Sequence, residues 1–163
     1  MNCYLRKARQ GEENTIYAMI AARIKWMDDS GIHQWNDTDY LEVYPLDYYV
    51  DNLERIFVLA EKKTERILCA AIVLTQDKRW DAIEPSFYIH NFVSALDNHR
   101  AGMLFIQMLE KQAERENVSY IRLDSAADNE RLASYYEELG FKPCGVCLEG
   151  KYHGILRQKE VAG

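Results

Sequence analysis

The stretch Phe87-Tyr88-Ile89-His90-Asn91-Phe92-Val93, followed shortly by Asp97-Asn98-His99-Arg100-Ala101-Gly102, decides the fold of this chain. Its first part is apolar and aromatic and predicts a strand. Its second part is polar and predicts a turn. The apolar residues that follow recur at helical spacing: Phe105, Met108, Leu109 and Ala113. A strand that leads through a turn into a helix presents unpaired backbone N–H groups, so the turn is a candidate anion site.

A second strand and a second helix follow this unit. The strand is predicted over Tyr120-Ile121-Arg122-Leu123, and the helix begins near Asp128-Asn129 and stops at Gly140. Two strands joined by a helix predict a parallel pair. The whole stretch therefore reads as a βαβα unit.

The last helix resembles the GNAT superfamily of acyl-CoA-dependent N-acetyltransferases. In that family the helix typically reads Asn, then Tyr seven residues later, then Glu and a closing Gly-Phe. The matching residues here are Asn129, Tyr136, Glu137, Gly140 and Phe141. The resemblance implies an α/β fold with a mixed, mostly antiparallel sheet, a parallel central pair of strands and helices on both faces.

The resemblance also implies an activity. A GNAT enzyme moves an acetyl group from acetyl-CoA to a primary amine by direct attack, so the expected partner is a small-molecule or peptide amine and the expected cosubstrate is acetyl-CoA. The alternative is a non-catalytic acyl-CoA-binding or regulatory module that keeps the fold.

The pyrophosphate loop of GNAT proteins usually reads Gln/Arg-x-x-Gly-x-Gly/Ala. Glu110 and Ala113 in the following helix set its register on Asp97 to Gly102, where only the last position fits. Asp97 brings a negative charge unless it pairs with Arg100 or caps the helix, while Arg100 replaces a glycine but offers a cation to a phosphate. The residues expected to bind the coenzyme here are Asn98, His99, Arg100, Ala101, Gly102 and Met103.

Three residues of the first strand are expected to act through their backbone. The resemblance implies that Phe92, Val93 and Ser94 splay from the neighbouring strand, so that their N–H groups bond the pantetheine arm and polarise the thioester carbonyl. It also implies that Asn129 binds the pantetheine arm. Asparagine is common at helix starts, so Asn129 is equally well explained as a helix cap.

Two side chains are candidates for catalysis. Tyr136 lies at helical spacing with Leu132 and Leu139, which predicts a core residue; the resemblance makes its hydroxyl the acid that protonates the departing thiolate. His90 lies two residues before Phe92 and on its side of the sheet, so it is a candidate base, although a polar residue on a strand face is often only solvated. Glu42 is a weaker candidate.

The rest of the chain is predicted to supply a first strand, a long helix, a short helix and four more strands. The predicted ranges are Tyr4–Ala8, Glu12–Ser30, Leu46–Leu53, Ile56–Ala60, Ile67–Leu74, Cys144–Leu148 and Tyr152–Leu156. Residues 32–45 are expected to be irregular and 76–84 to form a polar loop.

Aromatic residues between the first two strands offer more large apolar surface than a loop ordinarily exposes. We expect Trp26, Trp35, Tyr40 and Tyr44 to line an acceptor pocket or a homodimer interface. For Trp26, plain core packing on the inner side of its helix is an equal alternative.

Composition limits the remaining choices. A chain of 163 residues with 48% hydrophobic residues predicts one domain over 1–163, and a net charge of −6 argues against nucleic-acid binding. No apolar run is long enough to cross a bilayer and no signal-peptide core precedes the first strand, so a cytoplasmic protein is expected.

The four cysteines do not predict a disulfide framework or a metal site. Cys144 and Cys147 have C-x-x-C spacing, but a zinc site needs two further ligands and His153 does not complete a set. We interpret the pair as two small apolar residues in or near a strand.

Overall fold

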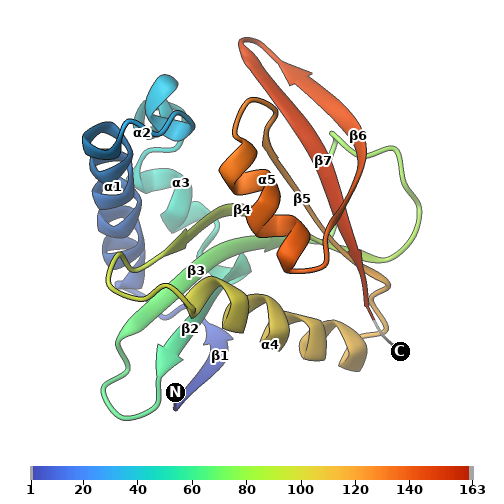
Figure 1. The fold of residues 1–163 in the computed structure, drawn as a ribbon. Helices are drawn as coiled ribbons and strands as arrows, with labels where there is room; N and C mark the ends of the chain where they lie inside the picture. Colours follow the sequence, from blue (N-terminus) through green and yellow to red (C-terminus); the bar gives the residue numbers. More distant parts are fainter. Residues whose placement is uncertain (1, 162–163) are drawn as a thin grey trace. The chain divides into compact units, whose positions relative to one another are not determined.

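The computed structural model describes residues 2–161 of the chain. It contains a seven-stranded sheet in the order β1-β2-β3-β4-β5-β7-β6 (Figure 1). The strands are β1 (Cys3–Lys7), β2 (Ile56–Glu61), β3 (Ile67–Leu74), β4 (Ser86–Ser94), β5 (Tyr120–Ala126), β6 (Lys142–Glu149) and β7 (Tyr152–Glu160). β4 and β5 are parallel, while β1–β2, β2–β3, β5–β7 and β6–β7 are antiparallel. The predicted mixed sheet with a parallel pair is confirmed.

The chain divides into two compact units, which are described separately here. The first unit comprises Met1–Ile72 and Asn91–Phe105, and the second comprises Val73–His90 and Ile106–Gly163. The division falls within β3 and β4 and within helix α4 (Ala101–Arg115). The single domain expected from chain length stays a prediction.

The long helix of the first unit is α1 (Glu12–Ser30). Its buried side chains are Ile16, Ile20 and Met27, as the helical spacing predicts. The helix ends at Gly31, whose φ of 68° lies in the left-handed region that glycine reaches without a steric penalty. The predicted helix is therefore confirmed at both ends.

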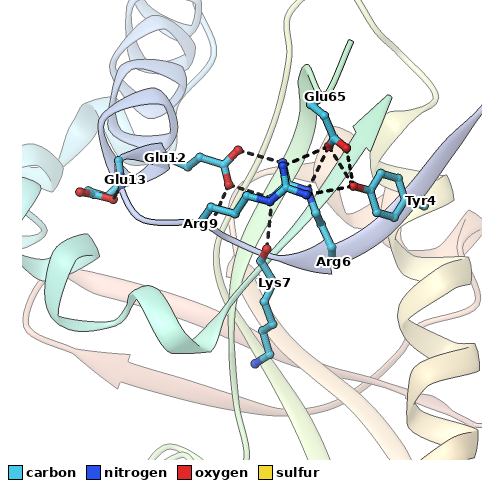
Figure 2. A network of polar contacts seen from close by, with 8 residues as sticks. Tyr4, Arg6, Lys7, Arg9, Glu12, Glu13 and Glu65 are labelled. Carbon is cyan, nitrogen blue, oxygen red and sulfur yellow. Dashed lines mark hydrogen bonds and ion pairs between the residues drawn. The ribbon is translucent and has the colours of Figure 1, made fainter. Parts of the chain in front are cut away.

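The start of α1 is held to β1 by a half-buried arginine. Figure 2 shows the Arg6 guanidinium between the carboxylates of Glu12 and Glu65, with N–O distances of 2.8 Å for both bonds to Glu12 and 3.2 Å to Glu65. Tyr4 donates a further hydrogen bond of 2.7 Å to Glu65. The side chain of Arg6 is only 10% exposed, so this network ties the strand, the helix start and the β2–β3 turn together.

We expect Glu12→Gln to lower the free energy of unfolding by about 1–2 kcal/mol at pH 7, because a bidentate charged hydrogen bond is lost. The bonds from Arg6, opposed by burial, lower the pKa of Glu12. This contribution is present above the unfolded-state pKa of glutamate and is lost as the pH falls through the lower folded-state value. Urea denaturation from pH 7 to pH 3 should therefore show the variant and the parent converging at acid pH. Glu114→Gln, at an exposed position of α4, is the control; an equal loss in both variants would contradict the assignment.

The segment after α1 contains more helix than the sequence predicts. A 3-10 turn lies at Trp35–Asp37, followed by α2 (Tyr40–Val43), α3 (Leu46–Asp51) and a second 3-10 turn at Leu53–Arg55. The expectation of an irregular segment over 32–45 was therefore only partly right. The helix predicted over Leu46–Leu53 is confirmed, with its regular part ending at Asp51.

In the second unit, most of α4 and the helix α5 (Glu130–Glu138) accompany strands β5, β6 and β7 (Figure 1). Its most deeply buried large side chains are apolar: Ile106, Leu109, Ile121 and Phe141. β5, β6 and β7 extend beyond the residues predicted for them. None of the helices described is long and apolar enough to cross a membrane.

The cysteine pair lies within β6, as expected. Cys144 and Cys147 are free thiols, and burial raises the pKa of both, which is opposite to the shift that a reactive redox pair needs. Residues 2–161 contain no group of His, Cys, Asp and Glu side chains arranged to hold a metal ion.

Candidate functional site

The second half of β4 has an irregular backbone. Asn91 has a φ of 54°, in the left-handed region that few residues other than glycine and asparagine adopt within a strand. The parallel ladder with β5 runs from Ser86–Tyr120 to Tyr88–Arg122, although β4 continues to Ser94. Such a local distortion re-aims backbone groups, as the predicted splay at Phe92 to Ser94 requires.

The end of β4 is tied to α1 in the first unit. The Arg23 guanidinium donates hydrogen bonds of 2.9 Å to the Ser94 carbonyl and 3.2 Å to the Ser94 hydroxyl. The same guanidinium lies 4.9 Å from the centre of the Trp26 ring. Trp26 is 37% exposed, so the interpretation that it packs in the core is wrong.

The turn after β4 forms the start of α4. The side-chain oxygen of Asn98 accepts the Arg100 N–H at 3.2 Å, and the Arg100 carbonyl accepts the Leu104 N–H at 3.1 Å. Asn98 therefore organises the turn, and Arg100 is the first residue whose carbonyl joins the helix. By helix geometry, the N–H groups of 101–103 have no acceptor one turn earlier. These are the amides that the sequence assigns to an anion.

Asp97 does not pair with Arg100 and does not cap the helix. Its carboxylate instead accepts two hydrogen bonds from Arg66, of 2.7 and 2.9 Å. The bonds from Arg66 lower the pKa of Asp97, so the residue remains an anion whose charge is balanced by Arg66, just before β3, rather than by a residue of its own turn. Both alternatives offered by the sequence were wrong here.

Aromatic rings in the first unit form a continuous series, which we call the aromatic ladder and define as Trp35, Tyr40, Tyr44 and Tyr48. Successive ring centres are 4.6, 4.9 and 4.8 Å apart. All four residues are half-buried. The Tyr40 hydroxyl is enclosed, and burial together with Tyr49 and Tyr44 raises its pKa well above the ordinary value. The Asn91 side-chain amide donates a hydrogen bond of 2.6 Å to this hydroxyl, which joins the ladder to the irregular part of β4.

In the second unit, His90 has a carboxylate partner. Its Nε2 lies 2.8 Å from Oδ2 of Asp77, and the two side chains are 17% and 8% exposed. Burial is the largest single influence on Asp77 and opposes its ionisation, but the hydrogen bonds from His90 and the Arg79 backbone N–H, together with the charges of both residues, outweigh it and lower the pKa of Asp77. The alternative that His90 is merely solvated is therefore wrong. With a proton on Nε2, the lone pair of this imidazole is on Nδ1.

Tyr136 and Asn129 lie on and just before α5. The Tyr136 ring is 7% exposed and packs edge-on against Phe141, with ring centres 5.7 Å apart, so its core packing is confirmed. The side-chain oxygen of Asn129 accepts the Leu132 N–H at 3.0 Å and caps the helix. Gly140 follows the helix with a φ of 96°. The roles of Tyr136 and Asn129 toward a coenzyme stay predictions.

Comparison with known proteins supports one family. No protein-family model matches the chain. An uncharacterized N-acetyltransferase of Bacillus subtilis, YesJ, is 24% identical over 159 residues, which cover 92% of this chain and 86% of YesJ. The crystal structure of a GNAT-family acetyltransferase from Streptococcus agalactiae has a TM-score of 0.80 and 16% identity, covering 99% of this chain and 96% of that one. The chain has the fold of GNAT acetyltransferases.

A further solved structure of similar fold contains a ligand. The PaiA N-acetyltransferase of Thermoplasma acidophilum, in complex with coenzyme A, has a TM-score of 0.72 and 14% identity, covering 98% of this chain and 99% of that one. The GNAT fold predicted from the sequence is therefore confirmed. The segment predicted to be the pyrophosphate loop differs from the usual GNAT pattern at Asp97 and Arg100.

The second unit contains functional candidates that the sequence did not indicate. Arg79 donates a hydrogen bond of 3.0 Å to Asp124 and a further bond to Glu149, and Tyr152 donates one of 2.6 Å to Asp124. Burial and the Asp124 charge raise the pKa of Tyr152. Asp77 and Arg79 lie in a loop whose composition indicates only polarity, so no signal in the sequence distinguished them.

Proposed function

We propose that this protein transfers the acetyl group of acetyl-CoA to a primary amine by direct attack. The observation that carries the proposal is the GNAT pattern on α5: Asn129 caps the helix, Tyr136 lies within it, and Gly140-Phe141 closes it.

The proposed reaction breaks one bond and forms one. The amine nitrogen attacks the thioester carbonyl carbon, the developing oxyanion is stabilised by backbone N–H groups of Phe92 to Ser94, and the carbon–sulfur bond breaks. Tyr136 gives its hydroxyl proton to the departing thiolate. His90, held by Asp77, takes the proton that the attacking ammonium must lose.

Acetyl-CoA is proposed to place its pyrophosphate at the start of α4. The N–H groups of 101–103 and the positive end of the helix dipole favour an anion there. The φ of Arg100 is not positive, so the residue has the ordinary backbone that lets its side chain serve as a cation. The N-terminal amides replace part of what a glycine-rich loop would supply.

We expect Arg100→Ala to weaken acetyl-CoA binding by about tenfold at low salt, because a charge-assisted bond to phosphate is lost. The difference from the parent should shrink at high salt, since Arg100 is exposed and screened. Isothermal titration at two salt concentrations measures both effects. Lys111→Ala, farther along α4, removes the same charge as a control. Tighter binding by Arg100→Ala would show that the arginine obstructs the coenzyme.

The activity itself is tested with the purified chain, acetyl-CoA and a panel of primary amines. Release of free thiol should depend on the amine, and mass spectrometry should show an amine heavier by one acetyl group. Binding of acetyl-CoA without amine-dependent turnover would favour the regulatory module, for which the altered Asp97 and Arg100 positions are the structural argument.

A further inference from the structure

The segment between α1 and β2 is strongly acidic. Residues 26–54 contain no Lys or Arg. The carboxylates in this range are Asp28, Asp29, Asp37, Asp39, Glu42, Asp47, Asp51 and Glu54. All of them are on exposed residues. The potential over this segment therefore favours cations and disfavours a negatively charged ligand.

The aromatic ladder lies in the middle of this acidic segment. Its rings are in mutual contact and half-buried, so each retains an accessible part. An aromatic face attracts an ammonium through its quadrupole, and the attraction grows where water is partly excluded. Rings that served only core packing would be inaccessible to solvent, as the Tyr49 side chain is at 0% exposure.

The inner end of the ladder is polar. The Tyr49 side chain is fully buried, and its hydroxyl lies beside the Asn91 amide, which also donates a hydrogen bond of 2.6 Å to Tyr40. A primary amide has two N–H groups, so Asn91 can serve both hydroxyls. The ladder therefore joins polar groups at its Asn91 end to aromatic faces farther out.

We propose that the acceptor is a diamine or longer polyamine, with one nitrogen at the Asn91 end of the ladder and a second, charged nitrogen over its rings among the carboxylates. The reacting nitrogen would then lie next to Phe92, the first of the three backbone positions assigned to the thioester. This inference rests on the proposed function for the statement that one nitrogen of the ligand reacts with the thioester. The proposed binding site itself consists only of residues of the first unit. The inference names the class of amine that the enzyme would acetylate.

The test uses three ligands that share a five-carbon chain with one amino end and differ in the group at the other end. The probes are 1,5-diaminopentane, pentylamine and 5-aminopentanoate, titrated into the full chain with and without free coenzyme A. The diamine should bind at least about tenfold more tightly than pentylamine, and the amino acid most weakly. The preference for the diamine should fall with added salt. Equal affinity of the diamine and pentylamine would overturn the proposal.

Two variants locate the binding site. Trp35→Leu should weaken diamine binding by roughly 2- to 30-fold, the range of a cation–π contact, and leave acetyl-CoA binding unchanged. Asp39→Asn, Glu42→Gln and Asp47→Asn combined should reduce the preference for the diamine. The matched control removes three exposed charges elsewhere: Asp81→Asn, Glu114→Gln and Glu160→Gln. An equal loss in the control would overturn the assignment to this segment.

The two proposals fail in different ways. Acetylation of monoamines with no preference for the diamine would overturn the polyamine inference and leave the acetyltransferase intact. Selective diamine binding with no acetylation of any amine would support the binding site and overturn the proposed activity.

Discussion

Tyr136→Phe is expected to lower kcat by about 10- to 10⁴-fold while the Kd for acetyl-CoA stays nearly constant. The substitution removes only the hydroxyl, so the packing of the ring against Phe141 is retained. A thiolate that departs without a proton donor is a poorer leaving group, and the loss therefore falls on the chemical step. Steady-state kinetics, combined with titration of acetyl-CoA, separates the two quantities.

Tyr135→Phe is the matched control for this experiment. Tyr135 is the adjacent residue of α5, is less buried, and points about 100° away around the helix. It should retain nearly the full kcat. An acyl donor with a more acidic thiol should reduce the defect of Tyr136→Phe, because a weaker base needs less help from an acid. An unchanged kcat in Tyr136→Phe, with chemistry shown to limit the rate, would exclude the proposed role.

His90→Gln should lower kcat/KM by roughly 10²- to 10⁴-fold, the range expected for loss of a general base. The Kd for acetyl-CoA should stay nearly constant, because the base acts on the attacking amine and not on the coenzyme. His153→Gln, at an exposed position of β7, is the control and should keep the parent kcat/KM. An unchanged kcat/KM in His90→Gln would exclude the proposed base.

Asp77 acts in this proposal as a positioning residue for His90. Asp77→Asn leaves a hydrogen-bonding side chain of the same shape but removes the charge that stabilises the imidazolium. We expect a smaller loss of kcat/KM than in His90→Gln, about tenfold, because the imidazolium loses its charged partner. An unchanged kcat/KM, together with a lower free energy of unfolding, would assign the Asp77–His90 contact to stability alone.

Local sequence signals predicted most of the fold. Gly31 and Gly140 both lie just beyond helices that end where glycine adopts a positive φ. The β4-turn-α4 unit was predicted because the apolar residues change from a strand-like run to helical spacing along the chain. This pattern depends only on residues that are neighbours in the sequence. The same holds for the cap at Asn129. Signals of this kind are contained in a few consecutive residues, so a single sequence is enough to read them.

The candidate site depended on pairs that are distant in the chain. Asp97 pairs with Arg66, 31 positions away, and His90 pairs with Asp77, 13 positions away. A charged side chain has several potential partners, and only the folded backbone decides between them. The positive φ of Asn91 was equally hidden, since the residue lies inside an apolar run that predicts a regular strand.

Asn91 also limits how this protein can evolve. Its backbone conformation favours glycine, asparagine or aspartate, while its side-chain amide is the donor to Tyr40. Glycine would adopt the positive φ but has no side chain to donate to Tyr40. Aspartate would place a carboxylate against the enclosed Tyr40 hydroxyl. A change of acceptor that altered Tyr40 would leave this amide without its partner. New specificities are therefore easier to reach by exchanging the outer rings and carboxylates than by exchanging the residues that adjoin β4.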